Sequence, residues 1–222
     1  MNNKKLEQYA DLAVKVGVNL QKGEMLVISA PVHASVFVEK IVKRAYKAGA
    51  RNVTVQWSDD VVAKLGYKYK AKKELAKVPA WVIAQKDYYI ENKIAYLVVI
   101  SDNPESLKGV KPEKVAIARR ANGKALEKFR DYTGSNKIRW SIIAYPNKEW
   151  AKKMFPELPI GKALKKQWEY IEKTVRLDTV DPLKAWAEHQ NNINRRCGIL
   201  NSSEIVSFHY KNSLGTDFPV GM

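Results

Sequence analysis

Two patterns of hydrophobic and polar residues alternate along the chain. Short, mainly apolar runs of strand length occur at 25–30, 52–57, 95–101 and 138–145. Around these runs, apolar residues recur at the spacing of one helix face, which predicts helices near 4–17, 36–46, 60–76, 79–91, 111–131, 150–155, 161–174 and 182–196. Strands that alternate with helices favour an α/β fold, so we expect an open, mostly parallel sheet with helices on both faces.

Glycine and proline residues support several of these boundaries. Gly17 follows the first helix pattern, Pro31 ends the first strand run, and Gly49 lies where a C-terminal helix cap is expected. In the last helix pattern Pro182 occupies the first position, and Gly198 is expected to end the helix. The first strand, helix and second strand therefore predict a βαβ unit with a right-handed crossover.

A further strand pattern lies near the end of the chain. Residues 205–210 lead into a turn at Gly215, Thr216 and Asp217. We expect residues 1–200 to form an N-terminal α/β domain and 201–222 to hold the first strand or strands of a second, truncated domain. A strand needs a neighbour because its backbone groups must be paired. We therefore expect this strand to have no sheet within the chain, and residues from about 201 onward to be the least settled.

Composition narrows the class of protein. The chain has 222 residues, of which 45% are hydrophobic, enough for a substantial core. No apolar run approaches the roughly 20 residues of a membrane span, and the first residues do not form the apolar core of a secretory signal. The single cysteine, Cys197, excludes an intrachain disulfide and a multi-cysteine zinc site. These features predict a cytoplasmic protein with no membrane partner.

The formal net charge is +16, and six lysines fall between residues 64 and 77, where Glu74 alone offsets them. Such a cluster is typical of a surface that binds nucleic acid or another polyanion. A lysine-rich solvated surface is the simpler explanation. We favour the second explanation because the chain has no zinc-finger spacing, aromatic RNP motif or Gly-x-x-Gly loop in the expected context. We therefore expect no specific nucleic-acid partner.

Polar residues follow the predicted strands, where α/β proteins usually bind ligands. The turn after the first strand has no Gly-x-Gly-x-x-Gly or Gly-Lys-Ser/Thr sequence, which argues against a dinucleotide or triphosphate site. His33 and Ser35 in that turn are interpreted as helix caps. Asp59 and Asp60 follow the second strand and Asp102 follows the third. Aspartates at these positions could bind a metal ion, but we favour helix capping for them too.

The remaining candidates do not form a recognisable site in the sequence. His189 and His209 lie far from His33 and from each other, and no His-Glu-x-x-His motif is present. Cys197 follows Arg195 and Arg196 but has no histidine in a catalytic context, so we interpret it as a buried structural thiol. The residues alone therefore predict no catalytic, cofactor-binding or metal-ligating constellation.

Several segments nevertheless resemble a known family. Residues 7–24, from Glu7-Gln8-Tyr9 to Lys22-Gly23-Glu24, are similar to the start of the thermophilic-type metalloaminopeptidases, the group of aminopeptidase T, aminopeptidase S and PepS. Further similar segments follow in the same order over essentially the whole chain. They are Trp150, Phe155-Pro156, the Trp168 helix, Asp181-Pro182 with Trp186 and His189, Leu200-Asn201 and Gly215-Thr216-Asp217.

The resemblance implies an N-terminal α/β domain followed by a catalytic domain that binds two divalent cations (Co, Zn, Mg or Mn). In the family the Glu, His and Asp ligands lie downstream of the segment that matches Gly215-Thr216-Asp217, so no residue of this chain inherits a ligand role. The implied partners are peptide substrates and a second copy in a homodimer, with the N-terminal domain shielding or gating the active-site cavity. Two alternatives stay open: a stand-alone module that binds polyanions, and a small-molecule-binding α/β protein with acidic clusters at its strand ends.

Overall fold

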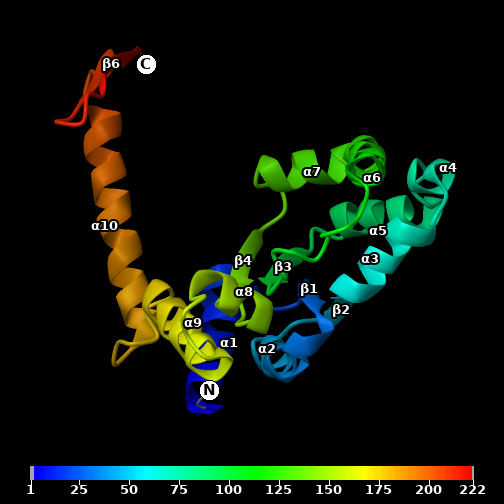
Figure 1. Cartoon of the computed structure of the whole chain (residues 1–222). Helices are drawn as coiled ribbons and strands as arrows, with labels where there is room; N and C mark the ends of the chain where they lie inside the picture. The colour runs from blue at the N-terminus through cyan, green and yellow to red at the C-terminus, as the bar shows by residue number, and fades with distance from the viewer. Residues whose placement is uncertain (1–2, 222) are drawn as a thin grey trace. The chain divides into compact units, whose positions relative to one another are not determined.

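The computed structural model describes residues 3–221 (Figure 1). The chain divides into two compact units, Met1–Pro182 and Leu183–Met222. The expected domain boundary at residue 200 stays a prediction. The strands of the first unit are β1 (Met25–Pro31), β2 (Asn52–Ser58), β3 (Ala95–Ile100) and β4 (Trp140–Ala144). Its helices are α1 (Asn3–Leu12), α2 (Ser35–Lys47), α3 (Asp60–Tyr69), α4 (Lys72–Leu75), α5 (Ala80–Glu91), α6 (Pro112–Ala125), α7 (Glu127–Gly134), α8 (Lys148–Met154) and α9 (Ile160–Thr174).

The four strands of the first unit form one sheet in the order β2-β1-β3-β4, and all neighbours are parallel. The predicted open parallel sheet is therefore confirmed. All three crossovers contain helices, as parallel neighbours require. The order changes direction between β1 and β3, because β1 continues through α2 to β2 on one side while β3 continues to β4 on the other. The loops after β1 and β3 therefore diverge at the centre of the sheet.

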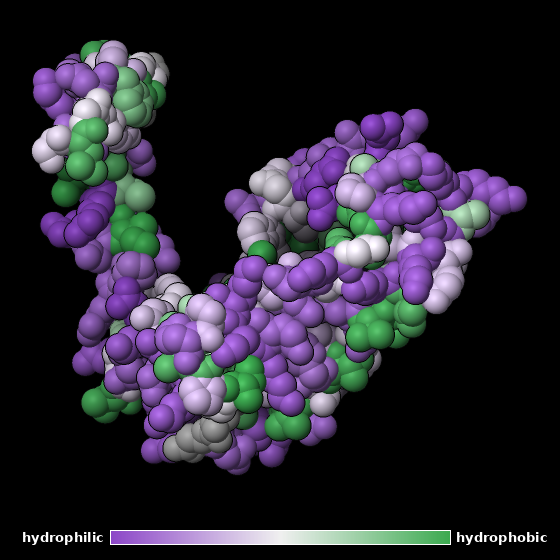
Figure 2. All heavy atoms as spheres, viewed as in Figure 1, coloured by the Kyte–Doolittle hydropathy of each residue, from purple (hydrophilic) through white to green (hydrophobic). Residues whose placement is uncertain are grey.

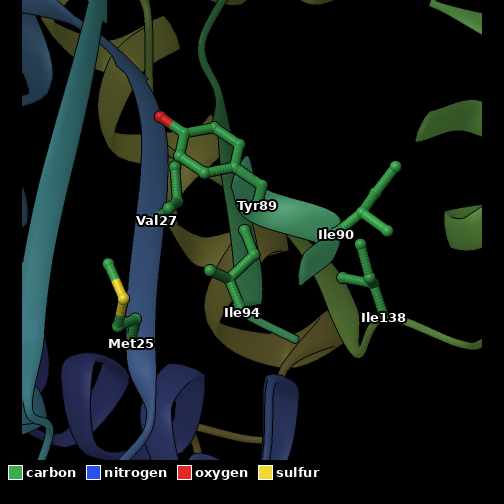
Figure 3. Packing of buried hydrophobic residues seen from close by; sticks show 6 residues of the cluster. All are labelled: Met25, Val27, Tyr89, Ile90, Ile94 and Ile138. Atoms are coloured by element: carbon green, nitrogen blue, oxygen red, sulfur yellow. The ribbon is translucent and has the colours of Figure 1, made fainter. Parts of the chain in front are cut away.

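Helices cover both faces of this sheet (Figure 1). On one face Met25 and Val27 of β1 pack with Tyr89 and Ile90 of α5 (Figure 3), and partly buried aromatic residues of α7 complete the cluster. On the other face Tyr9 of α1 stacks on Phe37 of α2 with ring centroids 4.9 Å apart. Alternate residues of a strand point to opposite faces, so β1, which is buried on both, reads as a continuous apolar run.

The first predicted helix, 4–17, is confirmed with a change of geometry near its end. After Leu12 the chain continues as a π-helical turn, η1 (Ala13–Gly17), which packs beside β4. A Cβ atom at Gly17 would lie only 3.1 Å from Ser141 Oγ of β4. A larger residue at position 17 would therefore require Ser141 to shift by a few tenths of an ångström.

Two long predicted helices are each broken in two. The helix expected at 60–76 ends at Tyr69, because Lys70 and Ala71 are extended, and resumes as α4. The carbonyl oxygens of Lys68 and Lys70 at this break accept hydrogen bonds from Lys114 Nζ at 2.9 and 2.7 Å. Lys114 belongs to α6, so a tertiary contact supports the break and local spacing could not reveal it. The helix expected at 111–131 is likewise divided at Leu126 into α6 and α7.

The last elements are α10 (Pro182–Ser202), β5 (Ser207–Lys211) and β6 (Asp217–Gly221), which belong to the second unit except for Pro182, the last residue of the first. Helix α10 continues through Gly198, so the expectation that this glycine ends the helix was wrong. β5 pairs with β6 in an antiparallel hairpin, with Tyr210 opposite Phe218. The expected strand is therefore present but is paired within the chain, which corrects its interpretation as a strand without a partner. No described helix is both long and apolar enough to cross a membrane.

Candidate functional site

The strongest candidate site lies where the loops leave the carboxyl ends of the four parallel strands. In open α/β sheets, ligands bind in the crevice at the point where the strand order reverses, here between β1 and β3. The loop after β1 contributes His33 from a short 3-10 turn, η2 (Val32–Ala34), and the residue directly after β3 is Ser101. Asn147, at the start of α8, adds a side chain beyond β4.

A hydrogen bond joins the two central loops. His33 Nε2 lies 2.8 Å from Ser101 Oγ. The Ser101 hydroxyl donates to the carbonyl oxygen of Pro146 at 3.3 Å. When the Ser101 proton is directed to Pro146, Ser101 accepts from a His33 protonated at Nε2. In the other tautomer Nε2 is the acceptor, and both Ser101 Oγ and Asn147 Nδ2, 3.5 Å away, lie within its reach as donors. The loops after β1, β3 and β4 are therefore held together by one serine.

This serine–histidine pair is not arranged for nucleophilic catalysis. Ser101 is 0% exposed, so its hydroxyl is not accessible to a substrate. The carbonyl oxygen of Pro146 also competes with the imidazole for its proton. A nucleophile requires an accessible hydroxyl that donates to a base. The pair therefore acts as a clamp between loops.

Asp59 and Asp60, two of the three aspartates at the strand ends, accept hydrogen bonds from backbone amides. Asp59 caps α3, accepting from Val62 N at 2.9 Å, so capping is confirmed for this residue. Asp60 accepts from Asn103 N at 2.9 Å and connects α3 to the loop after β3. Partial burial raises the pKa of Asp102, with a further rise from the Asp60 carboxylate and an opposing effect of His33. Across residues 3–221, no three His, Cys, Asp or Glu side chains are grouped so that they could hold a metal ion.

The cap predicted for α2 was wrong. The N-cap position is Ala34, and neither His33 nor Ser35 provides a side-chain cap. The chain enters α2 through the 3-10 turn, whose own backbone bonds begin the helix. The imidazole of His33 is consequently free to reach the loop after β3.

A pocket of about 620 Å³ opens beside this clamp. A volume of roughly 300–1,000 Å³ is typical of small-ligand sites. Its lining combines an imidazole, an amide, charged side chains and two aromatic rings, contributed among others by His33, Asn147, Glu149, Lys165, Tyr145 and Trp168. Trp168 is 7% exposed, and its indole Nε1 has no hydrogen-bond partner among the described residues. The pocket is large enough for a small molecule, but its lining residues include no nucleophile paired with a base.

Sequence reasoning missed the contribution of α9 to this region. Gln167 is 1% exposed, and its side-chain oxygen accepts from Asn147 N at 3.1 Å. Its amide nitrogen has no partner among the described residues. The sequence did contain a sign of this contact, because Gln167 is a polar residue on the same helix face as the buried Ala163 and Ile171. A polar residue on an apolar helix face needs a hydrogen-bond partner and therefore marks a contact.

The other candidates belong to the second unit. His209 Nε2 lies 2.5 Å from Asp217 Oδ1 across the hairpin, and hydrogen bonds from Lys211 and His209 lower the pKa of Asp217. His189 makes an edge-on ring contact with Trp186 in α10. Cys197 is exposed, so its interpretation as a buried thiol was wrong. Cys197 lies in a part of α10 in which all side chains are exposed. The spacing of apolar residues along this helix did not predict that exposure.

Comparison with known proteins decides the family. The profile of the thermophilic metalloprotease (M29) family matches residues 2–222. The chain belongs to this family. It is 38% identical over 218 residues to aminopeptidase AmpS of Bacillus subtilis (strain 168), a match that covers 98% of this chain and 53% of that protein. It is 36% identical to aminopeptidase PepS of Streptococcus thermophilus, of which it covers 52%.

A solved structure supports the same assignment for the M29 chain. Wild-type AmpT from Thermus thermophilus superposes with a TM-score of 0.88 at 31% sequence identity, over 99% of this chain and 53% of that one. The resemblance to aminopeptidases T, S and PepS is thus confirmed, as is the α/β fold. The chain spans about half the length of the M29 relatives that it matches.

Proposed function

We propose that this chain is the N-terminal α/β part of a metal-dependent aminopeptidase that removes N-terminal amino acids from peptides. The observation that carries the proposal is the M29 match over residues 2–222. The names of the relatives, which include aminopeptidases AmpS and T, supply the reaction. We further propose that the whole protein acts in the cytoplasm as a homodimer and uses divalent cations (Co, Zn, Mg or Mn).

The metal centre is proposed to lie outside this chain. A dinuclear site needs several carboxylate or imidazole ligands at fixed geometry. The described residues do not fit this requirement, because they contain no group of three such side chains. Asp59 and Asp60 are adjacent in the sequence, but each accepts a hydrogen bond from a backbone amide. No catalytic step is therefore assigned to a residue of this chain.

The proposed role of the α/β unit is to shield or gate the active-site cavity and to support dimerisation. A cover of this kind must keep its shape, because gating depends on excluding water and wrong substrates from the cavity. The clamp at Ser101 and the covered parallel sheet supply that rigidity. The separate boundary proposed near residue 200 would then mark the start of the catalytic part.

The test has two arms. The purified chain is assayed on aminoacyl p-nitroanilides with each metal added, next to aminopeptidase T of Thermus thermophilus as the active control. We expect no turnover by the chain. In the second arm this chain replaces the matching segment of aminopeptidase T. We expect this hybrid protein to hydrolyse the substrates in a metal-dependent way, unlike the isolated chain.

A third protein, with the matching segment deleted from aminopeptidase T, tests gating. If the α/β unit controls access, the deletion should raise the rate on bulky polypeptides relative to that on small p-nitroanilides. Metal-dependent turnover by the isolated chain would contradict the proposed location of the metal site. An inactive but folded hybrid would contradict the proposed role of the chain.

A further inference from the structure

The positive charge of the molecule is concentrated on one part of the first unit. Residues 64–77 and 111–125 together hold eleven lysines and arginines but only two carboxylates, Glu74 and Glu113. These two segments therefore account for +9 of the net charge of +16. They include α4 and α6, which pack against each other. Figure 2 shows hydrophilic residues gathered over these two helices.

A groove of about 810 Å³ lies between α4 and α6. Its rim carries four cationic side chains: Lys72, Lys73, Arg120 and Lys124. Lys72 is paired with Glu113 at 2.6 Å. For the other three, no ion pair with any described residue exists within 4.0 Å. The rim therefore presents charge that the chain itself does not neutralise.

The floor of the groove is apolar. Ile117 and Ala121 lie one turn apart on α6 and line it together with small side chains from both walls. None of the described residues that line the groove is aromatic. Single-stranded nucleic acids depend on aromatic side chains on which their bases stack. An apolar floor without rings instead suits aliphatic side chains of a polypeptide.

Hydrogen bonds hold the two walls in place. Lys114 of α6 donates to the carbonyl oxygens of Lys68 and Lys70, just before α4. The Lys72–Glu113 ion pair adds a second connection between the walls. The groove is thus formed before any partner arrives, which lowers the entropic cost of binding.

We propose that this groove binds an acidic polypeptide segment of another protein, with carboxylates on the rim cations and aliphatic side chains on the floor. Complementary charge favours this partner and steers its approach. The same groove of a second copy is disfavoured as the occupant, because it would bring like charges together. The inference is independent of the proposed peptidase activity, since the groove lies on α4 and α6 and uses no residue of the pocket at the strand ends.

The probe is a fluorescently labelled peptide in which Glu alternates with Leu, titrated into the whole chain and followed by anisotropy. We expect saturable binding that weakens with salt. A peptide of Glu alone should bind more weakly, because it leaves the floor empty. The triple variant Lys73→Glu, Arg120→Glu and Lys124→Glu should weaken binding by about tenfold or more, because like charges then face each other.

A matched variant, Lys43→Glu, Lys47→Glu and Lys162→Glu, makes the same change in net charge at exposed positions outside the groove. It should retain most of the binding. Ala121→Phe fills the floor without changing charge and should also abolish saturable binding, which keeps the test valid if the triple variant fails to fold. Circular dichroism checks the fold of each variant.

Two results would overturn the proposal. Equal loss in the groove variant and the matched variant would mean that the peptide responds to net charge alone. Oligothymidylate that binds more tightly than the peptide, and loses its binding only in the groove variants, would identify the occupant as nucleic acid.

Discussion

His33 Nε2 and Ser101 Oγ lie 2.8 Å apart and join the two loops that diverge at the centre of the parallel sheet. The two residues are 68 positions apart in the sequence. The Ser101 hydroxyl also donates to the carbonyl oxygen of Pro146, in the loop after β4. The loops after three strands are therefore bonded to one hydroxyl. The stability of the loop cluster should therefore depend on this side chain more than on any helix cap nearby.

Removing the hydroxyl tests this dependence. Ser101→Ala leaves the carbonyl oxygen of the buried Pro146 without its donor and removes the partner of His33 Nε2, so it should lower the free energy of unfolding by about 1–3 kcal/mol. Urea denaturation measures the change. Ser35→Ala is the matched control, because Ser35 provides no cap to α2, and it should change stability by less than about 0.5 kcal/mol. Equal effects of the two substitutions would contradict the clamp.

Tyr9 offers a second test. Its hydroxyl donates to Ala144 O at 3.0 Å and accepts from Ala144 N at 3.2 Å, and burial raises its pKa. Tyr9→Phe leaves both backbone groups unpaired and should cost about 1–3 kcal/mol of unfolding free energy. Tyr170→Phe, at an exposed position on α9, serves as control in the same denaturation experiment. A Tyr9→Phe protein as stable as the control would show that the hydroxyl is not needed.

The ion pairs between α1 and α2 should make stability depend on pH. A hydrogen bond from Lys40, with a further one from Arg44, holds the pKa of Glu7 below its ordinary value of 4.5 against the opposing effect of burial. A carboxylate whose pKa is lowered by folding stabilises the protein above its unfolded pKa, and this contribution is lost as pH falls through the folded pKa.

The variant Glu7→Gln should accordingly be less stable than the parent at neutral pH. The difference between the two should shrink as the pH falls below about 4.5. Thermal melts over a pH series measure this convergence. A gap that stays constant into the acid range would show that Glu7 acts through packing and not through charge.

Hydrogen exchange should distinguish the two sheets. β5 and β6 form a two-stranded hairpin whose residues are largely exposed, whereas β1 is buried on both faces. An isolated hairpin is only marginally stable in water. Amides of Phe208 and Tyr210 should therefore exchange much faster than those of Val27 and Ile28. Similar protection at both places would mean that the hairpin gains support beyond its own pairing.

The sequence predicted the sheet well because its strands are apolar runs whose environment is uniform. β1 is enclosed by neighbours on both sides and by helices on both faces, so nearly every residue had to be apolar. The breaks in the lysine-rich helices could not be predicted in the same way. The break after Tyr69 is stabilised by Lys114, which lies more than forty residues away.

The pocket was predictable only in part. His33, Asp59 and Asp102 were recognised because they follow strands, but their partners could not be inferred, and Ser101 was counted as the last residue of a strand. The hydrogen bond between His33 and Ser101 depends on β1 and β3 being neighbours, although β2 lies between them in the sequence. Asn147 and Gln167 meet because α9 packs against α8. Such pairings depend on topology, which residue spacing alone does not encode.

Both edges of the four-stranded sheet are bonded by tyrosine hydroxyls from the helices. Tyr9 exchanges two hydrogen bonds with Ala144 on β4, and the Tyr46 hydroxyl accepts from Val53 N on β2 at 3.3 Å. Each hydroxyl occupies a backbone position that a fifth strand would otherwise use. Intermolecular sheet growth, the usual route from an open edge to aggregation, is thereby opposed at both ends. Association of this unit with a second copy is consequently expected to use helix surfaces and not a continuous intermolecular sheet.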